Sequence, residues 1–189
     1  QTAELAAVPC QCGKVPFSTA EAIRMLQTCE ACGRTFDREE SLHNLSKVSE
    51  ANKNVRKGGD PMDHVKKLTA LEKLVKPGAT NGVPPKSPEV MRLLSNLAQL
   101  HYHLASRVKG SHAAESLKSF HHYQKQIAWR FEEMHGDWSK QRDATYLQVL
   151  YMSLTTQGLD AESRDEMAKK LSDACETMFG QPCLPDPLS

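Results

Sequence analysis

The chain has 189 residues, of which 39% are apolar and 25% are charged, and its formal net charge is +1. This composition fits one medium-sized globular domain, or a small module joined to a larger one, and argues against disorder along the whole length. The small net charge gives no overall attraction to nucleic acid or to a membrane surface. No apolar run approaches the roughly 18 residues of a spanning helix, so no membrane partner is expected.

The first segment, residues 1–46, contains four of the six cysteines of the chain. These four cysteines form two pairs that are close in sequence, Cys10-x-Cys12 and Cys29-x-x-Cys32, and a glycine follows each pair. A Cys-x-x-Cys-Gly turn aims two thiolates at one point, and glycine lets the backbone curl around a metal ion. The 16 residues between the pairs are a spacing typical of four-cysteine zinc sites. The sequence therefore predicts a zinc-binding unit with a structural Zn²⁺ on these four cysteines, and the alternative is two adventitious thiol pairs or disulfides.

The second cysteine pair also resembles the first half of a Cys₂His₂ zinc finger, because Phe36 and Leu42 follow it at the finger spacing. The resemblance covers about 14 residues. A finger would need histidines at position 45 and near position 49, where this chain has Leu45 and Ser49, and His43 is two residues away. The four-cysteine site is therefore preferred, and the DNA-reading helix of the finger family is not transferred to this chain.

Reduced thiolates imply a reducing compartment, so we expect an intracellular protein, cytoplasmic or nuclear. The other two cysteines lie near the end of the chain. Cys175 falls on an apolar helical stripe and is expected to be a small buried hydrophobe. Cys183 lies in a proline-rich segment, either as a thiol or as a partner of Cys175.

Residues 47–76 are expected to be a basic helical segment. Asp37 is a predicted N-cap, Gly58-Gly59 ends the first helix, and Asp60-Pro61 begins the second. Eight basic residues stand here against four acidic ones. We expect a phosphate-contacting surface, for which the candidate nucleic-acid-binding residues are Lys47, Lys53, Arg56, Lys57, Lys66 and Lys67. The alternative is a solvated helix face balanced by residues 159–189, which hold three basic and seven acidic residues.

Residues 77–87 form a predicted linker, because two glycines and three prolines in this stretch prevent a helix. Residues 88–180 are expected to form a bundle of four long helices, separated by Gly110, Gly136 and Gly158. Short glycine connections favour antiparallel neighbours. The fold class is therefore an all-α antiparallel helical bundle of long helices preceded by a small Cys₄ zinc-binding unit, and residues 181–189 form an irregular tail. The predicted core stripes of the bundle include Leu93, Leu97 and Val108, then Phe120 and Ile127, then Tyr146, Leu150 and Tyr151, and finally Met167, Leu171 and Cys175.

No catalytic constellation is apparent, so we do not expect an enzyme. The sequence has no G-x-S-x-G motif, no phosphate-binding glycine loop and no dinucleotide fingerprint. Five of the eight histidines lie between positions 101 and 122, but their spacing places them on different helix faces. Glu132-x-x-His135 is a single copy of a pair that di-iron bundles use twice. Trp129 and Trp138 are expected to pack the end of the bundle, whereas exposure beside Arg130 would favour stacking on a base.

These observations favour a zinc-stabilised, non-enzymatic nucleic-acid-binding or transcription-regulatory protein. The alternative is a protein-interaction or adaptor module that docks a protein partner through its helices. An enzyme with a site assembled from scattered residues is the third hypothesis, although no titratable cluster can be named for it.

Overall fold

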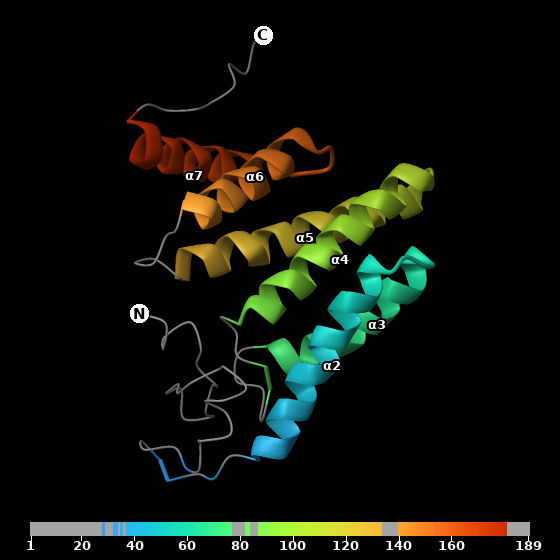
Figure 1. The fold of residues 1–189 in the computed structure, drawn as a ribbon. Helices are drawn as coiled ribbons and strands as arrows, with labels where there is room; N and C mark the ends of the chain where they lie inside the picture. The colour runs from blue at the N-terminus through green and yellow to red at the C-terminus, as the bar shows by residue number, and fades with distance from the viewer. Residues whose placement is uncertain are drawn as a thin grey trace. The chain divides into compact units, whose positions relative to one another are not determined.

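The computed structural model describes residues 28, 32, 33, 35, 37–76, 82, 83, 87–133 and 140–180. Six α-helices contain most of them (Figure 1), and the only other regular pairing in these ranges is an isolated antiparallel bridge between Thr28 and Thr35. The predicted all-α class is confirmed at this level. The six helices are α2 (Arg38–Arg56), α3 (Pro61–Val75), α4 (Pro88–Arg107), α5 (Ser111–Glu133), α6 (Lys140–Thr155) and α7 (Ala161–Phe179).

Helix ends fall where the local sequence predicts them. The Asp37 carboxylate accepts a hydrogen bond from the backbone N–H of Glu40 at 2.9 Å and begins α2. Asp60 caps α3 in the same way, with a proline in the first turn. The last helix ends at Gly180, whose N–H donates to the Glu176 carbonyl at 2.9 Å. These side chains satisfy backbone groups that a helix end would otherwise leave without partners.

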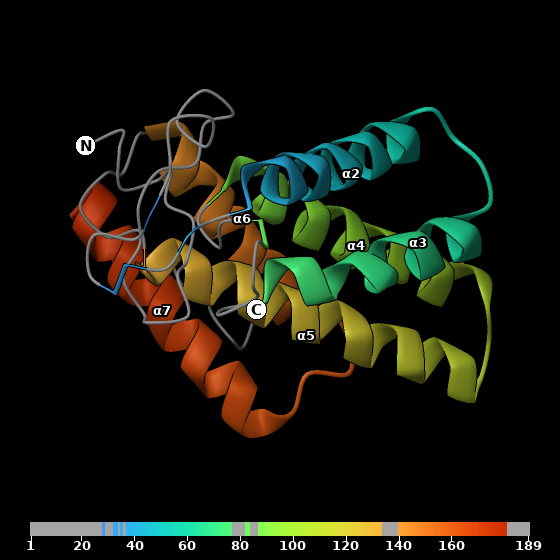
Figure 2. The same ribbon diagram turned by 90° about the horizontal axis from the view of Figure 1, so that it is seen from below.

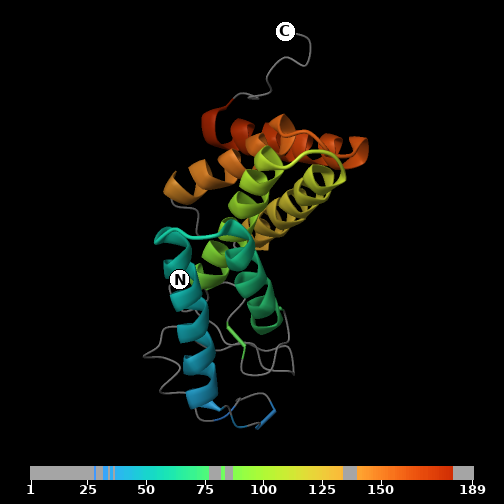
Figure 3. The same ribbon diagram turned by 90° about the vertical axis from the view of Figure 1, so that its right-hand side faces the viewer.

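The chain divides into two compact units, residues 1–100 and residues 101–189, and α4 crosses the division. In the first unit, α2 and α3 form an antiparallel hairpin and lie side by side in two views (Figures 1 and 3). Asn52 of α2 is fully buried and donates hydrogen bonds of 3.0 Å to Glu89 in the first part of α4. The buried apolar residues of this unit include Val48, Leu68, Val75, Val83, Val90, Leu93, Leu94 and Leu97.

In the second unit, α5, α6 and α7 follow one another in alternating directions (Figures 1 and 2). The helices of each unit pack side by side as in a helical bundle, which confirms that part of the prediction. The core of the second unit includes Phe120, Ile127, Phe131, Leu150, Met167, Leu171 and Cys175. No helix in the described part of the chain is long and apolar enough to cross a membrane.

Two residues predicted for the core lie at the surface instead. Val108 follows the last residue of α4 and is 39% exposed. Tyr151 is 52% exposed, whereas its neighbour Leu150 is fully buried. Successive helical residues are rotated by about 100°, so only one of two adjacent apolar residues can face the centre of a narrow interface. The buried side of α6 runs through Tyr146, Val149, Leu150 and Ser153, and Tyr151 lies on nearly the opposite side of the helix.

Candidate nucleic-acid interface

The predicted zinc segment is described at only a few positions. Cys32 is exposed, and the Thr28–Thr35 bridge closes the chain around it. Gly33 has a φ of +69°, a backbone conformation that favours glycine. The other three predicted ligands, Cys10, Cys12 and Cys29, lie outside the described residues, as does the predicted helix at 19–27. Within the described ranges no group of three or more His, Cys, Asp or Glu residues could hold a metal ion.

All six predicted nucleic-acid-binding residues lie on the α2–α3 hairpin and are exposed. Five of them gather near the turn at residues 57–60, where α2 ends and α3 begins. Lys47 lies further along α2, about 9 Å from Lys53 along the helix axis. We call the group nearest the turn the hairpin patch, and it consists of Lys53, Arg56, Lys57, Lys66 and Lys67.

Helical geometry explains why the patch faces solvent. Val48 and Asn52 are both buried, which defines the inner side of α2. Lys57 follows Val48 by nine residues, which is half a turn away from it around the helix. On α3, Leu68 is 1% exposed and Lys66 lies two residues before it, on nearly the opposite side. Burial of the apolar residues therefore turns these lysines outward on both helices.

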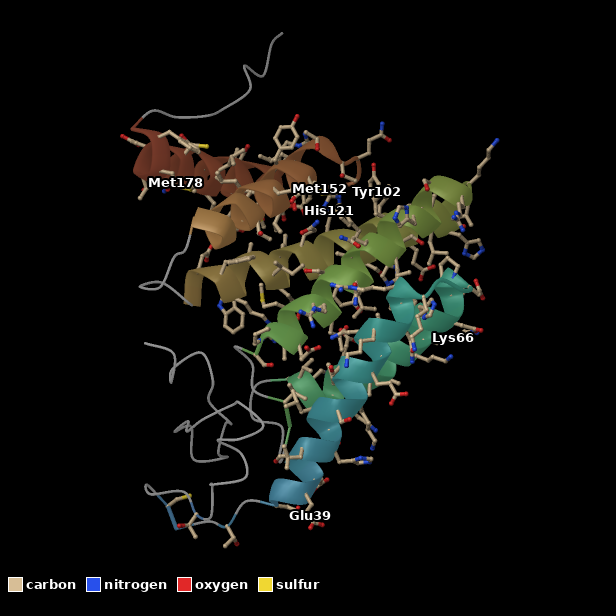
Figure 4. All side chains as sticks on the ribbon, in the orientation of Figure 1. Glu39, Lys66, Tyr102, His121, Met152 and Met178 are labelled. Atoms are coloured by element: carbon tan, nitrogen blue, oxygen red, sulfur yellow. The ribbon has the colours of Figure 1, made fainter. Side chains whose placement is uncertain are left out.

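The charge of the hairpin is segregated along its length. The acidic residues Asp37, Glu39 and Glu40 stand at the start of α2, far from the patch along that helix. Figure 4 labels Glu39 and Lys66 at opposite ends of the hairpin. Asp60 and Asp63 lie near the patch, and Asp60 is engaged as the N-cap of α3. The turn therefore carries a net positive charge on a chain that is nearly neutral overall.

No ion pair that involves the hairpin patch occurs among the residues that the structure describes. The ion pairs found there are Arg92–Glu89, Lys170–Glu132 and Lys170–Glu166. With respect to the described acidic residues, these cations are available to an external anion. Because the side chains are exposed, their mutual repulsion is screened by salt and costs little stability.

Two histidines of the second unit, His101 and His121, are at least partly buried, whereas His103, His112 and His122 are exposed. His121 is only 5% exposed, and its Nε2 lies 3.0 Å from the Gln157 carbonyl oxygen. The ring of His101 stacks on Tyr123 with centroids 5.7 Å apart. Burial lowers the pKa of both histidines below the ordinary value. One local signal agrees with the burial of His121, because this residue follows Leu117 by four residues and Phe120 directly.

A polar network centred on Glu132 joins α5, α6 and α7 of the second unit. The Tyr146 hydroxyl donates to Glu132 at 3.0 Å, and Lys170 bridges Glu132 and Glu166. Burial would lower the pKa of Lys170, but the hydrogen bonds to both glutamates outweigh it and raise that pKa. Glu132 is thus engaged by Tyr146 and Lys170, whereas His135 of the Glu132-x-x-His135 pair lies outside the described residues.

Trp129 does not pack the end of the bundle as predicted. Its side chain is 44% exposed, and the guanidinium carbon of Arg130 lies 5.8 Å from the centroid of the indole ring. Because Trp129 is adjacent to the buried Ala128, its side chain is rotated away from the core by the helical repeat. The indole is therefore accessible for stacking, whereas Trp138 lies outside the described residues.

The chain matches no protein-family model, no curated protein and no solved structure. A functional assignment therefore rests on the chemistry of the described side chains.

Proposed function

We propose that this chain is a zinc-stabilised, non-enzymatic protein that binds nucleic acid, with a role in transcription regulation as its expected setting. The observation that carries the proposal is the hairpin patch, which presents five exposed cations on the α2–α3 hairpin. None of these five side chains forms an ion pair with another described residue. A phosphate backbone offers regularly spaced anions to such a surface.

The composition of the patch favours contacts with phosphates over contacts with bases. Four of the five side chains are lysines, which are point charges on flexible stems. Only Arg56 has the planar fork that reads guanine edges in two hydrogen bonds. Contacts to phosphates position a protein on a duplex without reading its sequence. We therefore propose binding with little base preference through this surface.

The zinc ion is proposed to order the segment that precedes the hairpin. The ligands would be Cys10, Cys12, Cys29 and Cys32, in a closed tetrahedral site with a structural role. The Thr28–Thr35 bridge and the positive φ of Gly33 support the proposal, because a zinc knuckle contains this kind of turn. The cap Asp37 follows almost directly, so an ordered knuckle would fix the start of α2.

The decisive experiment measures binding of the zinc-loaded chain to duplex DNA and to RNA at several salt concentrations. The triple variant Lys53→Gln, Lys57→Gln and Lys66→Gln is compared with the control Lys109→Gln, Lys118→Gln and Lys169→Gln, whose lysines are exposed in the second unit. Each lost phosphate contact should reduce the slope of log K against log salt by about 0.9. The hairpin variant should lose up to about three such contacts, and the control should bind like the parent chain. Absent binding, salt-independent binding or equal losses in both variants would refute the proposal.

The metal is tested separately by measuring zinc per chain after purification under reducing conditions. The expected value is about one ion, as a four-ligand structural site requires, and the double variant Cys29→Ser and Cys32→Ser should lose it. Zinc near zero, with the cysteines oxidised to disulfides, would contradict both the metal site and the reducing compartment.

Exposed apolar side chains of α6 and α7 support a second candidate function, a protein-interaction module. Tyr151 is 52% exposed and Phe179 is 58% exposed, and aromatic side chains are enriched at protein interfaces. A double variant Tyr151→Ser and Phe179→Ser should abolish binding of a protein partner and leave nucleic-acid binding intact. The hairpin variant should have the opposite pattern, so the two functions can be separated.

A further inference from the structure

Three side chains on one face of α5 contact the turn between α6 and α7 and the first residues of α7. Leu117, His121 and Lys125 are four residues apart and therefore share a helix face. A Cβ at Gly158 would lie 3.5 Å from Leu117 Cβ, so the turn packs directly against this side chain. His121 Nε2 bonds to the Gln157 carbonyl at 3.0 Å, and the Lys125 ammonium donates to Ser163 Oγ. Three successive contacts thus attach residues 157–163 to α5.

The middle contact depends on the protonation state of His121. Because a carbonyl oxygen only accepts, Nε2 must carry the proton in this hydrogen bond. Nδ1 then carries a lone pair in the neutral ring. That atom is buried and has no hydrogen-bond partner among the described residues. Adding a proton to Nδ1 would place a donor and a positive charge in a buried position without an acceptor, which is costly.

The charged groups that face His121 come from α5 and from the start of α7. Lys125 and Arg164 oppose a positive charge on the ring, whereas Asp160 favours it. Asp160 is already engaged, because it accepts from the backbone N–H of Ser163 at 2.8 Å and from the Ser163 hydroxyl at 2.7 Å. Burial has the largest effect and lowers the pKa of His121, whereas the hydrogen bond to the Gln157 carbonyl raises it, and the balance of all these influences is a lowered pKa.

We propose that His121 is a proton-operated latch that holds the α6–α7 turn on α5 when neutral and releases it when protonated. The ring takes one proton from water at Nδ1 and becomes an imidazolium. The new N–H at Nδ1 then needs water as an acceptor, and the ring reaches water by leaving the Gln157 carbonyl. Residues 157–163 lose their central attachment, and the start of α7 opens toward solvent. Figure 4 labels His121 on α5, the helix that carries this stripe.

The direction of the pH effect follows from linkage. The ordinary pKa of histidine is about 6.5, and the pKa in the closed state lies below it. The open state therefore binds more protons below pH 6.5, and the stability of the closed turn falls with pH from there down to the folded pKa. Within this window the opening equilibrium should rise by up to about tenfold per pH unit, because one proton is taken up. Above pH 7 the closed turn keeps its full stability.

Hydrogen exchange of the amides in residues 156–163 tests the latch in the full chain at pH 7 and pH 5, with rates corrected for the intrinsic pH dependence of exchange. Protection in the parent chain should fall by up to about tenfold per pH unit. His121→Gln keeps a donor and has no titrating ring, so its protection should not change with pH. His122→Gln removes an exposed neighbouring histidine on the same helix and should behave like the parent. Constant protection in the parent, or an equal loss in His121→Gln, would overturn the proposal.

A second variant keeps the test decisive if His121→Gln does not fold. Lys125→Gln removes a cation that opposes protonation of His121. The pH midpoint at which the amides of residues 156–163 lose protection should therefore move to higher pH, whatever the effect of this variant on the protection at pH 7. In the parent chain, the NMR titration of the His121 ring should have the same midpoint as the loss of protection. Two different midpoints, or an unmoved midpoint in Lys125→Gln, would show that another group controls the turn.

Discussion

Charged side chains behave differently in the α2–α3 hairpin and in the three-helix part of the second unit. In the hairpin, the lysines of the patch point to solvent, and no ion pair among the described residues engages them. In the second unit, Lys170 binds two glutamates and Lys125 donates to Ser163. The same residue type therefore serves an external surface in one unit and internal attachment in the other. Local charge counts alone do not reveal which role a lysine has.

The acidic residues of α7 bear on the alternative explanation of the basic segment, in which they would only balance its charge. Asp160 caps α7, and Glu166 pairs with Lys170. Both acids thus have partners within residues 101–189. The predictions below test whether the two regions differ as described.

The largest effect is expected from the core of the second unit. Phe120 is fully buried, and replacing it with alanine removes an aromatic ring from a packed interface. Phe120→Ala should lower the free energy of unfolding by about 3–5 kcal/mol. Phe179→Ala removes the same kind of ring from a position that is 58% exposed. This variant should change the free energy of unfolding by less than about 0.5 kcal/mol. Urea unfolding followed by circular dichroism measures both, and similar losses would show that Phe179 is not a surface residue.

Much of this fold could be predicted from sequence because the signals are local. The caps Asp37 and Asp60 act on backbone groups within three residues, so each helix start can be read directly. The position of a side chain around its helix is less certain, as the exposed Tyr151 shows. The hydrogen-bond partner of His121 could not be predicted, because Gln157 lies 36 residues further along the chain.

The candidate nucleic-acid interface, like the fold, could be predicted from the sequence only in part. Charge alone indicated that lysines such as Lys53 and Lys66 would be exposed, and the structure agrees. Whether they have internal partners depends on which acids fold near them, which requires tertiary structure. The zinc ligands stay a prediction, because Cys10, Cys12 and Cys29 lie outside the described residues.

The second prediction concerns the buried polar network of the first unit. Asn52 donates to the backbone and carboxylate oxygens of Glu89 and accepts from Asn96, each at 3.0 Å. Asn52→Ala leaves these groups without partners in a site where the side chain is fully buried. The free energy of unfolding should fall by about 1–3 kcal/mol. Asn54→Ala on the same helix, at a partly exposed position, should cost less than about 0.5 kcal/mol. Equal costs in urea unfolding would contradict a special role for Asn52.

A smaller effect is expected from the network that joins α5, α6 and α7. Tyr146→Phe removes the hydroxyl that donates to Glu132 and leaves the carboxylate bound to Lys170. The expected loss is about 1 kcal/mol, because one hydrogen bond disappears and the ring stays in place. Tyr151→Phe is the matched control on α6, since that side chain is half exposed. Thermal unfolding of the two variants should differ, and identical midpoints would show that the network adds no stability.

The smallest effect on stability is expected from the hairpin patch itself. Lys57→Gln removes a charge that has no ion pair among the described residues, so the free energy of unfolding should change by less than about 0.5 kcal/mol. Lys170→Gln removes a cation that bridges two glutamates in a half-buried site, and its cost should be larger. Chemical unfolding of both variants at low and high salt measures this difference. A stability loss in Lys57→Gln equal to that in Lys170→Gln would mean that the patch lysine has a structural role. Near-neutral stability together with weakened nucleic-acid binding would instead show that the hairpin cations act on an external partner.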